Sequence, residues 1–237
     1  RDRSTLDENL LVVGTDDGLV QITKDGGNTW IKIDNIPGAP SQSYVNSVFT
    51  SQHDKNRIYV AFNHHKYGDF KPYIFMTEDM GNTWTTISSN LPNRGSVYAI
   101  EEDHEDPGLI FCGTEFGVFF SPNNGKNWKE LSMGLPTIAV RDIAIQREMN
   151  DLVLGTFGRG FYVLDDYSML RSVENKQVQE KAMILPIRDA IMWEKSNPLG
   201  LPGKSFQGDN FYVGENLDPV AMICLLYTSP SPRDAHK

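Results

Sequence analysis

An eight-residue pattern occurs three times in this chain, and it restricts the possible folds more than any other feature. The copies are "TKDGGNTW" from Thr23, "TEDMGNTW" from Thr77 and "SPNNGKNW" from Ser121, so they begin 54 and then 44 residues apart. A period of about 40–50 residues is typical of the four-stranded blades of a β-propeller. The longer first interval contains an insertion, "NHHKYGDFKP", at residues 63–72.

The same order of strand-like segments surrounds each octet. An apolar run such as "LLVVGTDDG" (10–18) is followed by "LVQITKD", then by "TWIKID" after the octet, and "YVNSVFT" (44–50) begins the next unit. These segments are rich in β-branched and aromatic residues and are bounded by Gly, Asn, Asp and Pro, as strands are. No convincing amphipathic helix precedes residue 168. The sequence therefore predicts an all-β fold: a partial β-propeller of about three and a half four-stranded blades.

The octet has the form S/T-x-D-x-G-x-x-W, and we expect it to form the turn between two strands. Its hydroxyl and carboxylate can accept hydrogen bonds from nearby backbone N–H groups, its Gly supplies backbone freedom, and its Trp can cover the hairpin. The third copy has an amide in place of the acid, and an amide cannot act as a general acid or a nucleophile. We therefore interpret the octet as structural. Its pattern residues are Thr23, Asp25, Gly27, Trp30, Thr77, Asp79, Gly81, Trp84, Ser121, Asn123, Gly125 and Trp128.

Composition excludes several classes of partner. The chain has 237 residues, of which 39% are hydrophobic, enough for a sizeable core. Its net charge of −9 argues against binding to nucleic acid or to anionic membranes. No apolar run approaches the roughly 20 residues that span a bilayer, so we expect no membrane insertion. Cys112 lies in the apolar run "LIFCGT" and is expected to be a buried free thiol.

The three octets, together with "GTDDG", "GTEFG" and "GTFGRGFYVLDDYSMLR", resemble a prokaryotic group of sortilin-like BNR-repeat, or Asp-box, β-propeller proteins. The resemblance covers roughly residues 10–223 and includes "NPLGLPGKSFQGDNFY" at 197–212. Members are often labelled glycosyl hydrolases on the basis of the repeat alone, and they are long, exported proteins. The resemblance thus implies an internal fragment with further blades in the parent chain, and an extracellular, periplasmic or cell-surface location.

Four segments follow from this pattern. Residues 1–168 are expected to form the blades, because "VLDDYSML" (163–170) lacks the Gly and Trp of the octet and terminal repeats are atypical. Residues 169–183 are expected to be a linker or short helix, and 184–223 the start of a truncated C-terminal β domain. Residues 224–237, which open with "CLLYTSPSPRD", resemble a translated sequencing adapter and are expected to be a non-native tail.

Candidate ligand-binding residues lie in two turns. His64, His65 and Asp69 belong to the insertion, where binding loops tend to occur. Adjacent histidines point apart in an extended chain, so a metal site would need a further coordinating residue from elsewhere, and no metal is predicted. The alternatives are that the insertion contacts a bound ligand or peptide, or that it is a plain solvated loop. Arg159 in "GTFGRGF" could bind a carboxylate or pair with the acids of "LDDY". The acidic segment "EEDHEDPG" (101–108) is expected to be a charged loop, because it has no calcium-loop pattern.

A glycosidase needs two opposed carboxyl groups or, in sialidases, an arginine cluster with a tyrosine nucleophile. The acids of this sequence lie mostly in turns and no arginine cluster is evident, so no catalytic residue and no cofactor is predicted. We expect a binding scaffold that recognises peptide, protein or glycan ligands through its blade loops. The alternative is a sialidase- or xyloglucanase-like glycoside hydrolase whose active site lies largely outside this stretch.

Overall fold

The computed structural model describes residues 1–132 and 134–173, together with 182–184, 186, 189–190, 192, 220 and 225–227. The chain divides into two compact units, Arg1–Gln179 and Glu180–Lys237. In the second unit, β16 (Ala182–Ile184) pairs antiparallel with β17 (Leu225–Tyr227). Most of the two predicted C-terminal segments lies outside the described residues, so the predicted domain boundaries stay predictions.

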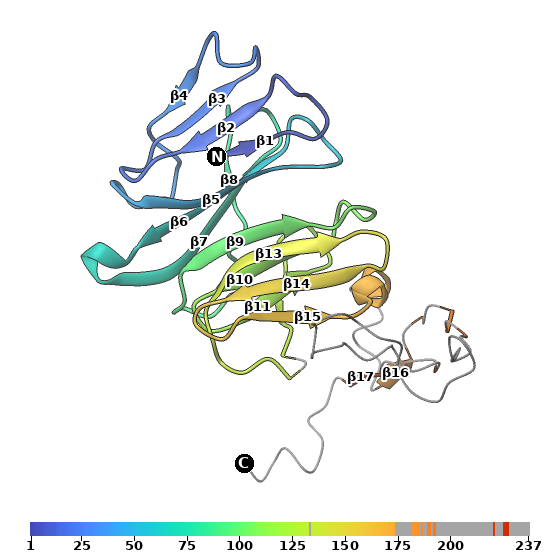
Figure 1. Cartoon of the computed structure of the whole chain (residues 1–237). Helices are drawn as coiled ribbons and strands as arrows, with labels where there is room; N and C mark the ends of the chain where they lie inside the picture. The colour runs from blue at the N-terminus through green and yellow to red at the C-terminus, as the bar shows by residue number, and fades with distance from the viewer. Residues whose placement is uncertain are drawn as a thin grey trace, which may run out of the picture. The chain divides into compact units, whose positions relative to one another are not determined.

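The first unit consists of four antiparallel sheets that follow one another along the chain, which we call blades 1 to 4 (Figure 1). Blade 1 contains β1 (Asp2–Arg3), β2 (Leu11–Gly14), β3 (Val20–Thr23) and β4 (Ile31–Ile33). Blade 2 contains β5 (Tyr44–Thr50), β6 (Ile58–His64), β7 (Asp69–Thr77) and β8 (Thr85–Thr86). Blade 3 contains β9 (Val97–Glu102), β10 (Ile110–Thr114), β11 (Val118–Ser121) and β12 (Lys129–Glu130). Blade 4 contains β13 (Val140–Gln146), β14 (Asp151–Thr156) and β15 (Phe161–Leu164). The predicted all-β fold of a partial propeller is confirmed.

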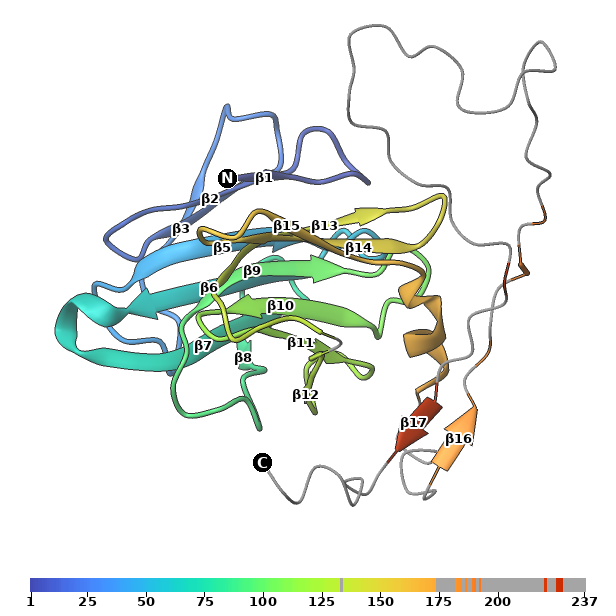
Figure 2. The ribbon, with the colours of Figure 1, turned by 60° about the horizontal axis from the view of Figure 1, so that its bottom comes forward.

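The first strand of each blade lies against the first strand of the next. β1 contacts β5, β5 contacts β9 and β9 contacts β13, and we call these four the inner strands. Figure 2 shows blade 3 extending from β9 through β10 and β11 to β12. The insertion at residues 63–72 lengthens the β6–β7 hairpin through the 3-10 helix η1 (His65–Tyr67). A second 3-10 helix, η2 (Tyr167–Ser172), follows blade 4.

Two apolar clusters fill the spaces between successive blades. β6 lies between them and is buried on both faces, because successive side chains of a strand point to opposite sides. Val60 belongs to the cluster shared with blade 1, whereas Tyr59 and Ala61 belong to the cluster shared with blade 3. Cys112 belongs to the second cluster and is fully buried as a free thiol, and burial raises its pKa. The unbroken apolar run "IYVAF" is what a strand covered on both faces requires.

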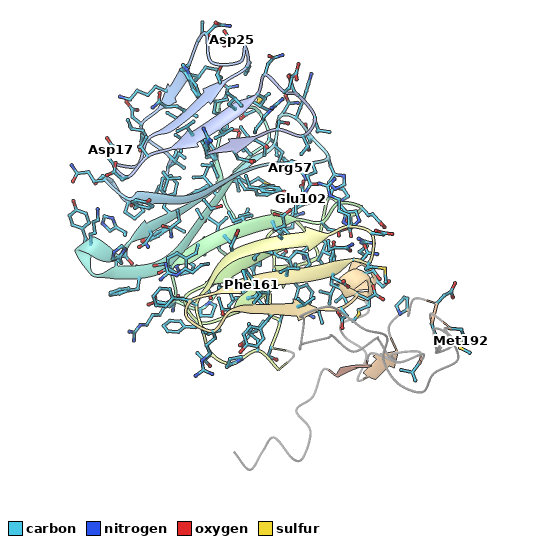
Figure 3. The ribbon with its side chains drawn as sticks, in the orientation of Figure 1. Asp17, Asp25, Arg57, Glu102, Phe161 and Met192 are labelled. Atoms are coloured by element: carbon cyan, nitrogen blue, oxygen red, sulfur yellow. The ribbon has the colours of Figure 1, made fainter. Side chains whose placement is uncertain are left out.

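The first octet closes a turn through side-chain hydrogen bonds to its own backbone. Thr23 Oγ1 accepts hydrogen bonds from Gly27 N at 2.9 Å and Asp25 N at 3.4 Å, and donates to Asp25 Oδ1 at 2.8 Å. The Asp25 carboxylate accepts from Thr29 N at 2.9 Å and from Thr29 Oγ1 at 2.6 Å. Figure 3 shows Asp25 in the turn that follows β3. The second octet repeats this pattern with Thr77, Asp79, Gly81 and Thr83.

The third octet makes the equivalent bonds with an amide. Ser121 Oγ accepts from Gly125 N at 2.9 Å and donates to Asn123 Oδ1 at 2.9 Å, and Asn127 N donates to the same amide oxygen at 2.9 Å. The acid is therefore used as a hydrogen-bond acceptor, a role that an amide also fills. In the first octet the Thr29 hydroxyl and N–H hold the pKa of Asp25 at about 2, so the group stays ionised at neutral pH. This geometry supports the interpretation of the octet as a turn-forming element.

Each internal octet also packs against the last residue of the outer strand of the blade before it, or the residue that directly follows that strand. Gly81 (φ 88°) and Gly125 (φ 77°) have left-handed backbones. A Cβ on Gly81 would lie 2.5 Å from Ile33 Cδ1, and one on Gly125 would lie 2.7 Å from Ile87 Cβ. These two positions therefore require glycine for the close approach of the preceding blade as well as for the turn.

The octet tryptophans differ in burial according to whether a blade precedes them. Trp128 is only 3% exposed, and its Nε1 donates to the carbonyl of Ile87 in blade 2 at 2.7 Å. Trp84 is partly buried against the cluster between blades 1 and 2. Trp30 has no described blade before it, is 41% exposed, and donates only within its own turn, to Gly27 O at 3.1 Å.

The hydrogen-bonding role of the octet predicts different effects at its first and third positions. Thr23→Val should lower the free energy of unfolding by about 1–3 kcal/mol, because it removes the acceptor for Gly27 N–H at the buried Thr23 side chain. Asp25→Asn should shift the urea midpoint less, since Asn123 fills the equivalent position in the third octet. Urea unfolding followed by circular dichroism compares the two variants. A larger loss for Asp25→Asn would contradict this assignment.

The interblade packing predicts unequal effects of truncating the octet tryptophans. Trp128→Ala should cost about 3–5 kcal/mol of unfolding free energy, as other large buried aromatic truncations do. Trp30→Ala should cost well under half as much, because much of its ring is in contact with solvent. Chemical denaturation of both variants under one set of conditions is the measurement, and equal losses would be inconsistent with the burial difference.

Candidate ligand-binding site

The acidic segment 101–108 differs from the charged loop expected from the sequence, because part of it is buried between blades. Glu102 is fully buried at the end of β9, and its carboxylate accepts hydrogen bonds from Ser51 Oγ at 2.8 Å and Tyr59 OH at 3.0 Å. Arg57 Nη1 lies 3.7 Å from Glu102 Oε1 (Figure 3). The carboxylate therefore ties blade 3 to blade 2.

Asp103 makes a second buried tie. Its carboxylate receives two hydrogen bonds from Arg171 of η2, from Nε at 2.8 Å and from Nη2 at 2.9 Å, and one from Tyr167 OH at 2.5 Å. Burial raises the pKa of Asp103, but the hydrogen bonds from Arg171 and Tyr167 outweigh burial and hold the pKa below its usual value. These two acids are engaged in packing the unit together.

Glu101 has a different environment on the same strand. Burial raises the pKa of its carboxyl to about 8; the nearby Asp2 and Asp142 carboxylates add to the rise, and Arg147 opposes it. Gln52 Nε2 donates to Glu101 Oε1 at 3.2 Å. Glu101 therefore holds its proton at neutral pH beside other carboxylates, as a general acid must.

A pocket with a volume of about 390 Å³ lies at the opposite end of the inner strands, where β5, β9 and β13 begin. This volume is in the range of small-ligand sites. Its aromatic lining residues are Tyr44, Phe70 and Tyr98. Its polar and charged lining residues are Asn46, Asn63, His65, Lys66, Glu115 and Arg141. Blades 2, 3 and 4 all contribute to the pocket.

Arg141 is held between aromatic rings from two blades. Its guanidinium carbon lies 3.7 Å from the centroid of the Tyr98 ring in blade 3 and 5.2 Å from that of Phe157 in blade 4. A guanidinium stacked on a ring keeps N–H donors at its edge, which suit a carboxylate. Tyr98 thus positions a cationic donor at the pocket.

Arg94 repeats this arrangement one blade earlier. Its guanidinium carbon lies 5.9 Å from the ring centroids of both Phe70 in blade 2 and Phe116 in blade 3. Both rings are exposed, as are Tyr44 and Phe157. This end of the unit therefore presents aromatic side chains interleaved with arginines.

The pocket carries more positive than negative side chains, although the chain has a net charge of −9. Neither Arg141 nor Lys66 takes part in a salt bridge with another described residue. Asn63 Oδ1 accepts from His65 N at 2.9 Å and lies 2.6 Å from His65 Nδ1, so this ring nitrogen carries a hydrogen. A ligand carboxylate would meet two cations here and one acid, Glu115.

The four candidates from the sequence lie in different surroundings. His65 lines the pocket. The His64 ring stacks on the Tyr67 ring, with centroids 4.5 Å apart. His64 is the register partner of Asp69 in the β6–β7 pair, and the Asp69 carboxylate accepts a hydrogen bond from Tyr73 OH at 2.6 Å. Arg159 is exposed in the turn between β14 and β15. A ligand-binding role for these four residues stays a prediction.

No sequence pattern brings Arg141, Tyr98 and Lys66 together as one group. Arg141 and Tyr98 each lie second in an inner strand, and their proximity depends on how blades 3 and 4 pack. A phenylalanine lies next to glycine in both "GTEFG" and "GTFGRG". A turn at the surface rarely needs an aromatic residue, so these two turns were the sequence feature that indicated a binding surface at this end of the unit.

Two further properties concern metals and membranes. No group of three or more His, Cys, Asp or Glu side chains in the described part of the chain is arranged to hold a metal ion. Within the same residues, no helix has the length and apolar character needed to cross a bilayer.

In comparisons of sequence, the chain matches no protein-family model and no curated protein. Solved structures are similar in fold. YCF48 bound to D1 peptide has 20% identity and a TM-score of 0.52, with 69% of this chain and 50% of that chain covered. The GH74 enzyme of Niastella koreensis has 18% identity and a TM-score of 0.52, with 69% and 28% covered. The β-propeller domain of Myceliophteria thermophila Cps50 (Swd1) has 10% identity and a TM-score of 0.51, with 73% and 53% covered.

The chain thus spans about a quarter to about half of the length of these proteins. At such identities the similarity concerns the fold alone. Together with the four antiparallel sheets, it identifies the first unit as consecutive blades of a β-propeller.

Proposed function

We propose that this chain belongs to an exported, Asp-box β-propeller scaffold that binds a peptide segment of a partner protein at the pocket between blades 2, 3 and 4. The observation that carries the proposal is the pair of cations, Arg141 and Lys66, which line the pocket and have no salt-bridge partner among the described residues. Export is inferred from the resemblance to sortilin-like BNR-repeat proteins.

The pocket chemistry suits an extended peptide that carries a carboxylate. Arg141 can bind a carboxylate through two parallel N–H donors, and Lys66 adds a second positive charge. Tyr44 and Phe70 offer apolar surface for neighbouring side chains, and Glu115 can accept hydrogen bonds from a peptide N–H. Tyr44 and Arg141 lie at the start of the first strands of their blades, so this part of the site is built on a rigid frame.

Known propellers support this class of ligand. YCF48, which shares the fold, has been solved with a peptide bound. Exposed aromatic rings also stack on sugars, so a glycan is the competing ligand class, and the same experiment must include both.

Peptide and glycan arrays, followed by calorimetric titration of the best ligand, test the proposal. Acidic peptides should be selected, and Arg141→Gln should weaken their binding about tenfold or more, because a charge-assisted pair is lost. Arg147→Gln is the matched control, since Arg147 lies just beyond the other end of β13 and should leave affinity unchanged. Selection of neutral glycans without acidic peptides would refute the peptide assignment.

A glycoside hydrolase is the second candidate function, and Glu101 is the observation in its favour. Glycosidases need a carboxyl that is protonated at neutral pH near a second, ionised carboxylate. Glu101 has a pKa of about 8 and lies near Asp2 and Asp142. The GH74 enzymes share the fold. Hydrolysis of a glycan that is lost in Glu101→Gln, with glycan binding retained, would favour this function over the scaffold.

The raised pKa of Glu101 predicts a pH-dependent effect on stability. Its folded pKa of about 8 exceeds the reference value of 4.5, so the folded state binds more protons between these pH values and stability falls as pH rises through them. Glu101→Gln removes this loss. The variant should therefore gain on the order of 2 kcal/mol relative to the natural chain at pH 8.5 and little at pH 4.

Urea unfolding at a series of pH values measures this difference. Glu148→Gln, at an exposed position, is the control for removing one negative charge. A Glu101→Gln difference that is the same at pH 4 and pH 8.5 would show that Glu101 is not protonated in the folded chain.

A further inference from the structure

The inner strands of blades 2, 3 and 4 share an irregularity at their second residue. In β5, Val45 and Ser47 pair with adjacent residues of β6, so that Asn46 between them has no partner in the ladder. Tyr98 in β9 and Arg141 in β13 are left out of their ladders in the same way. We call Asn46, Tyr98 and Arg141 the bulge residues. A β-bulge changes the direction of the side chain of its extra residue, and bulges are frequent next to functional sites.

The three bulge residues meet at one place, because all of them line the pocket of about 390 Å³ between blades 2, 3 and 4. The residue before each is a buried valine: Val45, Val97 and Val140. Each inner strand is therefore anchored immediately before its bulge. The chain keeps this backbone arrangement in three successive blades while the side chain changes from an amide to a phenol to a guanidinium.

Asn46 has one end of its amide in use and the other open. Its Nδ2 donates to the carbonyl of Val97 in blade 3 at 2.6 Å. A carbonyl only accepts, so this bond fixes the amide with its nitrogen toward Val97 and its oxygen turned away. Asn46 Oδ1 accepts no hydrogen bond from another described residue, and the only buried side-chain nitrogen or oxygen without a partner in that part of the chain is Arg57 Nε. The Asn46 oxygen is therefore accessible and available to a ligand.

A second asparagine shows an amide that serves only to join the same two blades. Asn90, which follows β8, donates from Nδ2 to Trp128 O at 2.9 Å and accepts from Trp128 N through Oδ1 at 2.7 Å. Both ends of that amide are used between blades 2 and 3, and Asn90 is not part of the pocket lining. Asn46 joins these blades through its nitrogen alone, and its oxygen is left for another donor.

We propose that Asn46 Oδ1 is an acceptor subsite for a backbone N–H of the bound peptide, which crosses blade 3 with a carboxylate at Arg141 and this N–H at Asn46. The assignment rests on the proposed peptide-binding function and adds the orientation of the ligand. Arg141 only donates, and Asn46 presents only its acceptor, so the two ends of the site select opposite groups. A carboxylate placed at Asn46 Oδ1 would set two acceptors against each other.

Backbone esters of the ligand test this subsite. The probe is the acidic peptide selected on the array, with acetylated and amidated ends and with each backbone N–H replaced in turn by an ester oxygen. An ester removes the donor without adding bulk. In calorimetric titrations of the natural chain, one ester position should weaken binding about fivefold or more, because one hydrogen bond is lost. In Asn46→Ala the same ester should change the affinity less than about twofold.

Asn46→Asp separates contact with the ligand from the bond between blades. Asn46→Ala and Asn46→Asp both remove the donor to Val97 O, but a carboxylate at position 46 still accepts. The ester effect should therefore persist in Asn46→Asp, although the added negative charge lowers its affinity for every acidic peptide. Asn90→Ala is the matched control for a weakened interface between blades 2 and 3, and it should keep the full ester effect.

Three outcomes would overturn the proposal. One is a natural chain in which no ester weakens binding, and another is an ester effect of equal size in the natural chain and in Asn46→Ala. Loss of the effect in Glu115→Ala instead would assign the acceptor to Glu115. In each case a weaker affinity of Arg141→Gln for the unmodified peptide would leave the proposed function intact. Acidic peptides whose binding does not respond to Arg141→Gln would overturn both.

Discussion

The packing of the second and third octets against the preceding blade is the contact on which the arrangement of the sheets depends. Hydrogen bonds from backbone N–H groups to the octet's hydroxyl fix the turn, and the turn places a glycine and a tryptophan at the blade surface. Because a Cβ at Gly81 would lie 2.5 Å from Ile33 Cδ1, a side chain at that position would have to displace the Ile33 side chain of the preceding blade. One short pattern therefore determines both the hairpin and the spacing between blades.

The pocket between blades 2, 3 and 4 is a consequence of that spacing. Its cation Arg141 enters from blade 4 and rests on Tyr98 of blade 3, and Lys66 comes from the hairpin extension of blade 2. A shift of one blade against the next would separate Arg141 from its ring. The buried carboxylates of Glu102 and Asp103 oppose such a shift, because leaving either without its partners inside the unit is costly.

The sequence predicted those features that depend on neighbouring residues. The octet turn is local, since Thr23 and Gly27 are four residues apart, and its repetition indicated the propeller. Glu102 and Asp103 were expected in a charged loop, because their partners are distant in the sequence: Ser51 is 51 residues from Glu102, and Arg171 is 68 from Asp103. Charge and composition do not show which distant groups will meet inside a fold, so burial of these acids and assembly of the pocket required the structure.

The distribution of the acids explains how an acidic chain can present a cationic site. Asp25 and Asp79 are used within their own turns, and Glu102 and Asp103 are used between blades. Their charges are satisfied locally, so the net charge of −9 does not describe the field at the pocket. The pocket draws on blades 2 to 4, and its lining brings two cations, Lys66 and Arg141, together with one acid, Glu115.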